Sequence, residues 1–458
     1  MLDYKRSLDT RRAFLKTTAA LSATSLFHPN LLAATSDELG RTPNLRFGVN
    51  YTPRRLWWYC WLDWDQSSVL SDLQAVAQLG VDHIRIPCLW SLFQPGIGNV
   101  TDSALRNLAR LLDAADSAGL DVEVTVLNGW MSGLSFLPPW TAPLLKPGDT
   151  NAGNIFTDSQ VIAAEKLLFH RISATIGSHP RFLGFDIGNE LGVLQRPFLN
   201  PVSPAAADTW ARDMLAYCDE IAPGKFHVNG VDHSHWFNDY GFTRDEIATA
   251  GHASVVHSYI NFTGVLERYR YDSQASFHLA DYMIELAYAY QTNLDRPVWV
   301  EEIGVGNKEM PESFKPTFME HAIRNIAATG KAWGITWWCS HDIDPAVAGF
   351  DHYEYGLGLI DLDNQQKPLG KKYSELIAEL RKSPAEVATR STAMAIPDRG
   401  LTAAQWPPDW AFATRYMKLL DRGILPAIVL ENRTQNEAYL KRRGIKEVIP
   451  FSPQSMRH

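Results

Sequence analysis

The sequence has little cysteine, and its cysteines are far apart. Only 4 of the 458 residues are cysteine, and no two of them form a C-x-x-C pair. Zinc ribbons are built on such pairs, so the sequence does not predict one. The spacing leaves open whether any of them pair as disulfides, and we expect most to be free, buried thiols. They are Cys60, Cys88, Cys218 and Cys339.

The chain also lacks an excess of positive charge. It has 43 Lys and Arg residues against 51 Asp and Glu residues, and its formal net charge is −8. Proteins that bind nucleic acids need clustered cations to neutralise phosphates, so we expect no nucleic-acid partner. No strand-like segment is followed by a glycine-rich phosphate loop, which argues against a dinucleotide-binding fold.

The apolar run near the N-terminus is short. It covers residues 17–27, and about eleven residues are too few to span a bilayer. Arg11 and Arg12 precede it, an order that resembles the signal of the twin-arginine (Tat) export pathway, with cleavage near Ala34. We therefore expect residues 1–34 to be a Tat signal that directs the protein to the bacterial periplasm or exterior. After cleavage we expect no association with a membrane.

What the sequence does contain is a regular alternation of strand-like and helix-like segments. This alternation predicts βα units and a parallel sheet. Eight strands are predicted, at residues 45–51, 83–87, 121–127, 182–188, 226–229, 254–259, 298–302 and 334–338. Eight such units predict a (β/α)8 TIM barrel, which we place at residues 35–382. An open, doubly wound sheet is the alternative.

The predicted helices fill the segments between the strands. They lie at residues 65–79, 102–118, 159–176, 204–221, 245–250, 275–293, 311–329 and 369–381. The turns that lead into the strands are short, whereas the loops that follow the strands are long. Barrel enzymes build their active sites from the loops after the strands, so we expect the site at that end.

The composition changes after residue 382. Residues 383–410 are rich in Ala, Ser, Thr and Pro, and we expect a linker there. Residues 411–451 then alternate helical and strand patterns. We therefore predict that residues 383–458 form a linker followed by a small α/β C-terminal extension, whose role the sequence does not indicate.

Two of the predicted strands end in acidic residues. Asn189 and Glu190 follow the fourth strand, and Glu301 and Glu302 end the seventh. A carboxylate next to a buried strand is costly unless it is paired or has a chemical task. Because side chains alternate along a strand, Glu301 and Glu302 cannot both face the barrel interior.

The position of Glu302 favours it over Glu301 as the catalytic carboxylate of this strand. Glu302 lies on the same side of the strand as Val298 and Val300, and a turn follows it. We assign Glu302 as the nucleophile, with the reverse assignment as the alternative. Glu301 is then a supporting residue whose partner the sequence does not name.

The fourth strand supplies a second carboxylate, which could act as a general acid. A general acid is a carboxyl group whose proton is held near the operating pH by burial and by neighbouring charge. We assign this role to Glu190. Asn189, directly before it, is expected to donate a hydrogen bond to a sugar 2-hydroxyl group.

An Asn-Glu pair after the fourth strand and a Glu at the end of the seventh resemble clan A of the glycoside hydrolases. Over residues 45–382 the chain most resembles family 5, the cellulase and mannanase family. The resemblance implies that Arg85 holds the nucleophile and that Trp338 is the platform under the −1 sugar. It also implies that His257 and Tyr259 are the strand-six pair that bonds the catalytic carboxylates or the sugar.

The end of the third strand departs from the family pattern, which often has a histidine there. This chain has Asn128 and Trp130 instead, which we expect to bind a hydroxyl group and to stack on a sugar. The departure favours a mannan- or mannoside-type site. The polar stretches 232–236 and 341–354 suggest further hydroxyl-binding groups. Their irregular spacing argues against a metal site, and we predict none.

Together these residues predict a retaining β-glycoside hydrolase. Glu302 attacks the anomeric carbon while Glu190 protonates the leaving oxygen, and Glu190 then activates the water that releases the sugar. The expected partner is a β-linked oligo- or polysaccharide of mannan or glucan type, and no cofactor is needed. The alternatives are a non-catalytic carbohydrate-binding barrel and a transglycosylase using the same site. The sequence gives neither the sugar, nor endo or exo action, nor the oligomeric state.

Overall fold

The computed structural model describes residues 45–141, 153–195, 199–238, 240–397 and 411–451. The expected signal peptide at residues 1–34 lies outside these ranges. No helix within them is both long enough and apolar enough to cross a membrane. The four cysteines all lie within them and are free, buried thiols.

The centre of the molecule is a TIM barrel of parallel strands. Seven strands are hydrogen-bonded in the order β6-β3-β2-β1-β9-β8-β7, so that β1 lies between β2 and β9. Their bounds are β1 (Arg46–Asn50), β2 (His83–Leu89), β3 (Asp121–Asn128), β6 (Phe182–Asp186), β7 (Ser254–Ser258), β8 (Val298–Ile303) and β9 (Ala332–Trp337).

The strand predicted at residues 226–229 is present only as an extended segment. The amide of Phe226 donates to Leu183 (2.8 Å) and that of Val228 to Phe185 (2.9 Å), which places the segment beside β6. This pairing continues the parallel sheet past β6. The prediction of a regular fifth strand was therefore wrong in form, although the segment occupies a strand position.

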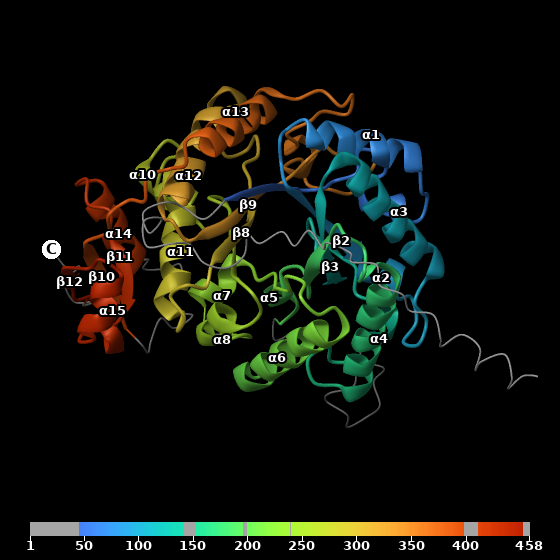
Figure 1. Ribbon diagram of the computed structural model, residues 1–458, viewed down its shortest axis with the longest axis horizontal. Helices are drawn as coiled ribbons and strands as arrows, with labels where there is room; N and C mark the ends of the chain where they lie inside the picture. Colours follow the sequence, from blue (N-terminus) through green and yellow to red (C-terminus); the bar gives the residue numbers. More distant parts are fainter. Residues whose placement is uncertain (1–44, 142–152, 196–198, 239, 398–410, 452–458) are drawn as a thin grey trace, which may run out of the picture. The chain divides into compact units, whose positions relative to one another are not determined.

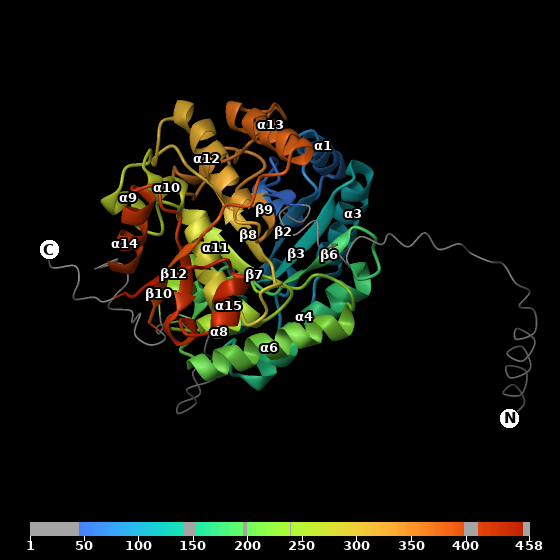
Figure 2. The same ribbon diagram turned by 60° about the vertical axis from the view of Figure 1, so that its left-hand side comes forward.

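Long helices lie around the outside of the strands (Figure 1 and Figure 2). Their bounds are α1 (Gln66–Ala77), α3 (Asp102–Ala118), α4 (Ser159–Ile176), α6 (Pro204–Ile221), α8 (Arg244–Thr249), α11 (Leu279–Tyr290), α12 (Lys315–Ala328) and α13 (Pro368–Lys382). The predicted bounds of α3, α4 and α6 match these. Capping residues explain two of the starts: Asp158 accepts hydrogen bonds from the first turn of α4, and Ser203 does so for α6.

The helix predicted at residues 275–293 is interrupted. The structure has α10 (Gln274–Phe277) and α11, with His278 between them. The His278 ring bonds the Asp281 carboxylate at 2.9 Å in the first turn of α11. The prediction of one continuous helix was wrong because this interruption depends on a side-chain contact that periodicity does not reveal.

Short elements occupy the loops that follow the strands and cover the carboxyl end of the barrel. The short helices are α2 (Trp90–Phe93), α5 (Leu191–Leu194), α7 (His233–Phe237) and α9 (Val265–Arg268). The 3-10 turns are η2 (Trp57–Trp61), η3 (Pro139–Thr141), η4 (Glu312–Phe314) and η5 (Glu354–Gly356), and one hairpin joins β4 (Trp130–Met131) to β5 (Leu134–Ser135). These loops carry most of the residues discussed below.

The C-terminal part forms a second, smaller parallel sheet. Strand β10 (Thr392–Ile396) lies between β11 (Ala427–Leu430) and β12 (Glu447–Ile449), together with α14 (Ala411–Leu420), η7 (Glu431–Arg433) and α15 (Glu437–Arg442). Strand β10 falls within the segment we expected to be a linker, and the prediction was wrong there. Alanine at alternate positions gave the strand the composition of a linker.

A buried ion cluster joins this small sheet to the barrel helix α11, which lies beside β11 (Figure 1). Arg390 donates to Asp281 of α11 at 2.5 Å, and Arg443 donates to Glu285 of α11 at 2.7 Å. Burial alone raises the pKa of Asp281, but His278 and Arg390 hold it below its ordinary value. Each of these two acidic residues of α11 is therefore paired with an arginine from the C-terminal part.

We expect Arg390→Ala to lower the free energy of unfolding by about 3–5 kcal/mol, because it removes the arginine that pairs with the buried carboxylate of Asp281 and leaves only the His278 ring beside it. The pKa of Asp281 is depressed by folding, so the pair stabilises the protein above the unfolded pKa of about 3.9. Its contribution is lost as the pH falls through the lower, folded pKa. Urea denaturation of wild type and variant at several pH values measures both effects.

Arg442→Ala is the matched control, because Arg442 pairs with Asp295 on the surface, with both side chains more than half exposed. It should leave the midpoint of unfolding unchanged. Equal effects of the two substitutions would show that the buried cluster is not what holds the C-terminal sheet.

Candidate active site

Two carboxylates meet at the carboxyl end of the barrel. Glu190 follows β6 and Glu302 lies in β8. One oxygen from each, together with a ring nitrogen of His257, all lie within 4.8 Å of one another. Carboxyl groups about 5–5.5 Å apart are typical of retaining glycosidases, whereas inverting enzymes hold them about 6.5–9.5 Å apart. The spacing fits attack by one carboxylate and protonation by the other.

The two carboxylates differ in exposure. The Glu302 side chain is 5% exposed and that of Glu190 is 22% exposed. Glu190 has a φ of 46°, in the left-handed region that non-glycine residues seldom adopt. This backbone turn ends the path of β6 and begins α5 at the barrel mouth. Strain of this kind persists where the surroundings fix the conformation, as at functional sites.

Arg85 of β2 connects the nucleophile to the neighbouring strand ends. Its guanidinium donates to Glu302 at 2.7 Å and to Asn50 at 3.0 Å through one nitrogen. Through its second terminal nitrogen, Nη2, the guanidinium donates to Asp186 at 2.7 Å and to Asn189 at 2.9 Å. Asn50 and Asp186 were not among the predicted site residues. The sequence could have indicated both, because they lie at the ends of β1 and β6, where barrel enzymes place their site residues.

Tyr259 completes the coordination of the nucleophile. Its hydroxyl donates to the second oxygen of Glu302 at 2.8 Å, so each carboxylate oxygen accepts a strong hydrogen bond. Burial raises the pKa of Glu302. The charges of His257 and Arg85 and the bond from Tyr259 limit that rise, while the charge of Glu190 adds to it. These donors favour the anionic form that nucleophilic attack requires.

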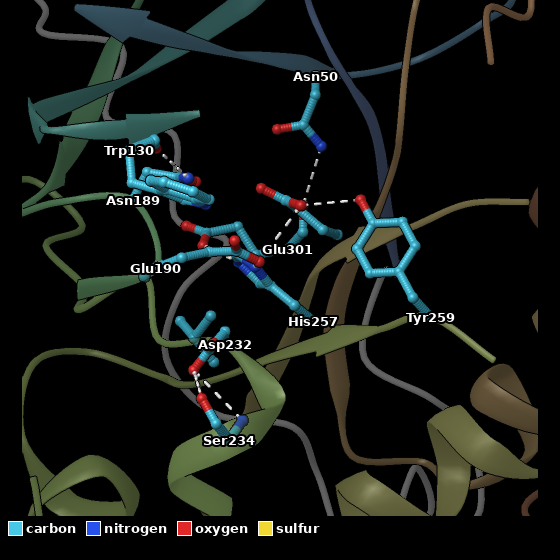
Figure 3. Close-up of polar contacts among 12 residues, drawn as sticks. Asn50, Trp130, Asn189, Glu190, Asp232, Ser234, His257, Tyr259 and Glu301 are labelled. Atoms are coloured by element: carbon cyan, nitrogen blue, oxygen red, sulfur yellow. Dashed lines mark hydrogen bonds and ion pairs between the residues drawn. The ribbon is translucent and has the colours of Figure 1, made fainter. Parts of the chain in front are cut away.

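His257 lies between the carboxylates at the ends of β6 and β8 (Figure 3). Nδ1 is 3.0 Å from Glu190 and Nε2 is 2.9 Å from Glu301. Burial lowers its pKa, but the charge of Glu302 and the bonds to Glu190 and Glu301 raise it well above the ordinary value. These surroundings favour the protonated ring, in which both nitrogens can donate to the carboxylates.

Glu190, His257 and Glu302 are close enough together to hold an ion. Both ring nitrogens of His257 are within hydrogen-bond distance of carboxylates, Nδ1 of Glu190 and Nε2 of Glu301. These contacts form a hydrogen-bonded chain from Glu190 to Glu301.

The prediction that Glu301 and Glu302 cannot both face the barrel interior was wrong: strand pairing shifts register where these residues lie in β8, and both carboxylates contact Arg85 and His257. The structure supplies the partners of Glu301. Its carboxylate bonds His257 and lies 3.5 Å from Nε of Arg85, in a fully buried position. Glu123 of β3 is also fully buried nearby. Burial and the charges of Glu301 and Asp186 raise its pKa well above the ordinary value. These surroundings favour the neutral form of Glu123 beneath the network, and the sequence did not indicate this residue.

The remaining predicted site residues border this network. Asn189 donates through its amide nitrogen to the backbone oxygen of Trp130 at 3.0 Å. Asn128 is fully buried, and neither atom of its amide has a protein partner in the described part of the chain. Trp338 is 6% exposed and packs edge-on against Trp58, with ring centroids 5.7 Å apart.

Most polar side chains of the stretches 232–236 and 341–354 form hydrogen bonds to neighbouring parts of the protein. His341 bonds Ser340 and Asn364, and Asp342 accepts from Lys367 at 2.8 Å. These contacts hold the loop after β9 to its own neighbours. The hydroxyl-binding role expected for residues 341–344 therefore has no support from their geometry.

In the other stretch, Asp232 caps α7 by accepting from Ser234 (Figure 3), and His235 bonds Gln195 at 2.7 Å. His233 differs, because its Nδ1 is buried without a partner in the described residues. Burial lowers its pKa, while the charges of Asp232 and Glu190 oppose this effect. His233 thus belongs to the surroundings of Glu190, and the sequence had singled it out only as part of a polar run.

Comparisons with known proteins give a consistent picture. No protein-family model matches the chain, and no curated protein matches it. Among solved structures, a GH5_18 variant from Streptomyces cattleya in complex with Manβ1-4GlcNAc is 35% identical, with a TM-score of 0.83, over 89% of this chain and 98% of that one. A GH5_18 variant from Bifidobacterium longum subsp. longum, also with Manβ1-4GlcNAc, is 30% identical, with a TM-score of 0.81, over 89% and 96%.

A more distant structure shares the fold. The exo-β-1,4-mannosidase Op5Man5 from Opitutaceae bacterium strain TAV5 is 21% identical, with a TM-score of 0.74, over 92% of this chain and 75% of that one.

We expect Tyr259→Phe to lower kcat/KM for an aryl β-glycoside roughly 10- to 100-fold, since a hydrogen bond to a charged group is worth about 1.5–3 kcal/mol. Loss of the bond should also raise the pKa of Glu302 further. The acidic limb of the pH profile of kcat/KM should then move to higher pH.

Tyr355→Phe is the control, because Tyr355 bonds only the backbone of Val347 at the barrel mouth. It should leave the acidic limb where it is in the wild type. A Tyr259 variant with reduced activity but an unmoved limb would mean that the hydroxyl does not act on the nucleophile.

Proposed function

This chain belongs to glycoside hydrolase family 5, subfamily 18, and from that membership we propose that it is an exo-acting β-mannosidase that releases mannose from Manβ1-4GlcNAc. Its chemistry is that of a retaining β-glycoside hydrolase. Two relatives that are 30–35% identical bind this disaccharide in their structures. The departure of Asn128 and Trp130 from the cellulase pattern supports the same substrate class.

The observation that carries this assignment is the pairing of Glu190 with a fully coordinated Glu302. Arg85 and Tyr259 hold the two oxygens of Glu302, which orients the carboxylate for attack on the anomeric carbon. Glu190, the more exposed of the pair, donates its proton to the glycosidic oxygen. The bond to the leaving sugar breaks as the ester bond to Glu302 forms.

The second step reverses these roles. The ester has removed the negative charge of Glu302, and Glu190 has become a carboxylate that accepts a hydrogen bond from His257. Glu190 then takes a proton from water, and the oxygen of that water attacks the anomeric carbon. The ester breaks, the sugar leaves with its β configuration retained, and both carboxyl groups return to their first state.

Contacts among the mouth loops support exo action. Trp57, in the loop after β1, packs against Phe136 at 5.8 Å and against Phe350 at 4.7 Å between ring centroids. These phenylalanines come from the loops after β3 and β9. Ser132 and Glu354 from the same two loops share a hydrogen bond. These contacts join the three loops on one side of the barrel mouth, which supports a site that takes the end of a glycan.

We further propose that residues 1–34 are a Tat signal that exports the protein. The support is the Arg11-Arg12 pair before a short apolar run. In a bacterial host the wild-type chain should then be found in the periplasm, and a chain with both Arg11→Lys and Arg12→Lys should remain in the cytoplasm. Identical fractionation of the two chains would argue against Tat export.

The substrate is tested with Manβ1-4GlcNAc, cellobiose and polymeric mannan. Mannose should be released rapidly from the disaccharide and slowly, from chain ends only, from the polymer. Early ¹H NMR spectra should show β-mannose as the first product. Glu302→Gln should lower kcat by on the order of 10⁴-fold or more, while Glu386→Gln on the exposed surface should not change it.

Azide distinguishes the two carboxylates. With an activated aryl β-mannoside and azide, Glu190→Ala should form β-mannosyl azide, because azide attacks the ester at Glu302. Glu302→Ala should form α-mannosyl azide, because azide takes the place of the missing nucleophile. The opposite pattern would reverse the assignment.

A further inference from the structure

We propose that Glu354, held by Ser132, binds hydroxyl groups of the non-reducing sugar and restricts the site to a terminal residue. This inference rests on the proposed function, since it names how the same site selects its substrate. Neither residue belongs to the strand ends that carry the catalytic network. Both come from loops that are more than two hundred positions apart in the sequence.

The contact between the two residues is specific. Ser132 Oγ donates to one oxygen of Glu354 at 3.0 Å. Ser132 and Gly133 form the two-residue turn between β4 and β5 with φ values of 50° and 82°, as in a type I′ turn. Serine is uncommon in this left-handed conformation. Here the conformation aims the hydroxyl at a carboxylate from another loop.

The second oxygen of Glu354 is available to a ligand. The structure records no protein hydrogen bond to it within the described ranges, and Glu354 is partly exposed. Burial and the charges of Glu302 and Glu190 raise the pKa of Glu354 to about 7. Glu354 thus lies within the electrostatic reach of both catalytic carboxylates and keeps one oxygen free beside them.

The neighbours of this pair place it on the side of the sugar that becomes bound to Glu302. The backbone of Trp130, in the same hairpin as Ser132, accepts from Asn189, the residue expected to meet the 2-hydroxyl group. Trp338, the expected platform under that sugar, leads into the loop that carries Glu354. Glu354 therefore faces the sugar being transferred rather than the leaving group.

The chemistry explains selection of a chain end. A carboxylate accepts hydrogen bonds from two neighbouring hydroxyl groups of a terminal sugar. In an internal sugar, one of these hydroxyl groups is replaced by a glycosidic bond, so one hydrogen-bond donor to Glu354 is lost. The next sugar of the chain would also collide with the Ser132–Glu354 contact. The site would thus bind a free non-reducing end and reject internal units.

The test compares the enzyme with substrates that lack single hydroxyl groups. Wild type, Glu354→Ala, Glu354→Gln and Ser132→Ala are assayed on aryl β-mannoside and on its 3-, 4- and 6-deoxy analogues. We expect Glu354→Ala to lower kcat/KM roughly 10- to 100-fold on the complete sugar. On the analogue that lacks the bound hydroxyl, wild type and variant should have similar kcat/KM values. Ser132→Ala should show a smaller loss with the same pattern.

Glu309→Gln is the matched control. Burial also raises the pKa of Glu309 to about 7, but its oxygens accept from the Gly306 amide and the Tyr353 hydroxyl. It should not alter the discrimination among the deoxy sugars. An equal loss for Glu354→Ala on every analogue would overturn the inference. If Glu354→Ala does not fold, Glu354→Gln and Ser132→Ala carry the same comparison.

The outcomes separate the two proposals. If the wild type does not cleave Manβ1-4GlcNAc or an aryl β-mannoside, the proposed function is wrong. If it cleaves both, and Glu354 variants discriminate among the deoxy sugars as the wild type does, only the role of Glu354 is wrong.

Discussion

The buried guanidinium of Arg85 is the interaction on which the site depends. A cation inside a barrel is stable only when its donors are paired, and the acceptors must come from whichever strands surround it. Here they come from β1, β6 and β8, through Asn50, Asp186 and Glu302. The same bonds that neutralise the cation fix the relative positions of these strand ends. This pairing fixes the position of Glu302 and, through Asn189, that of the backbone that carries Glu190.

His257 adds a second cation, and together the two organise the remaining carboxylates. Glu301, which is fully buried at a register shift of β8, bonds His257 and lies near Arg85. Burial and neighbouring negative charge raise the pKa of Glu123 beneath it, which favours its neutral form. The end of the barrel is therefore an ordered arrangement of charge rather than an apolar core with two acids on its surface. Such preorganised charge is what stabilises a transition state.

Much of this could be predicted from the sequence, for a physical reason. Parallel strands that are covered on both faces consist mostly of apolar residues in the sequence. An acidic residue at the end of such a run therefore stands out, as Glu190 and Glu302 do. Glu123 was not predicted, because it lies in an alternating segment that reads like a half-exposed strand. The contact between Ser132 and Glu354 depends on the conformations of two distant loops. Strand β10 was missed because its composition resembles that of a linker.

The ion cluster on α11 has a consequence for how the chain can be divided. This helix follows the strand that carries His257, and both acids of its buried face pair with arginines from the C-terminal part, Asp281 with Arg390 and Glu285 with Arg443. A barrel cut out at residue 382 would keep the acids and lose their cations. The catalytic part is thus not a portable module, although sequence composition marks a boundary there. Fusions and domain exchanges in this protein need to keep the small sheet with the barrel.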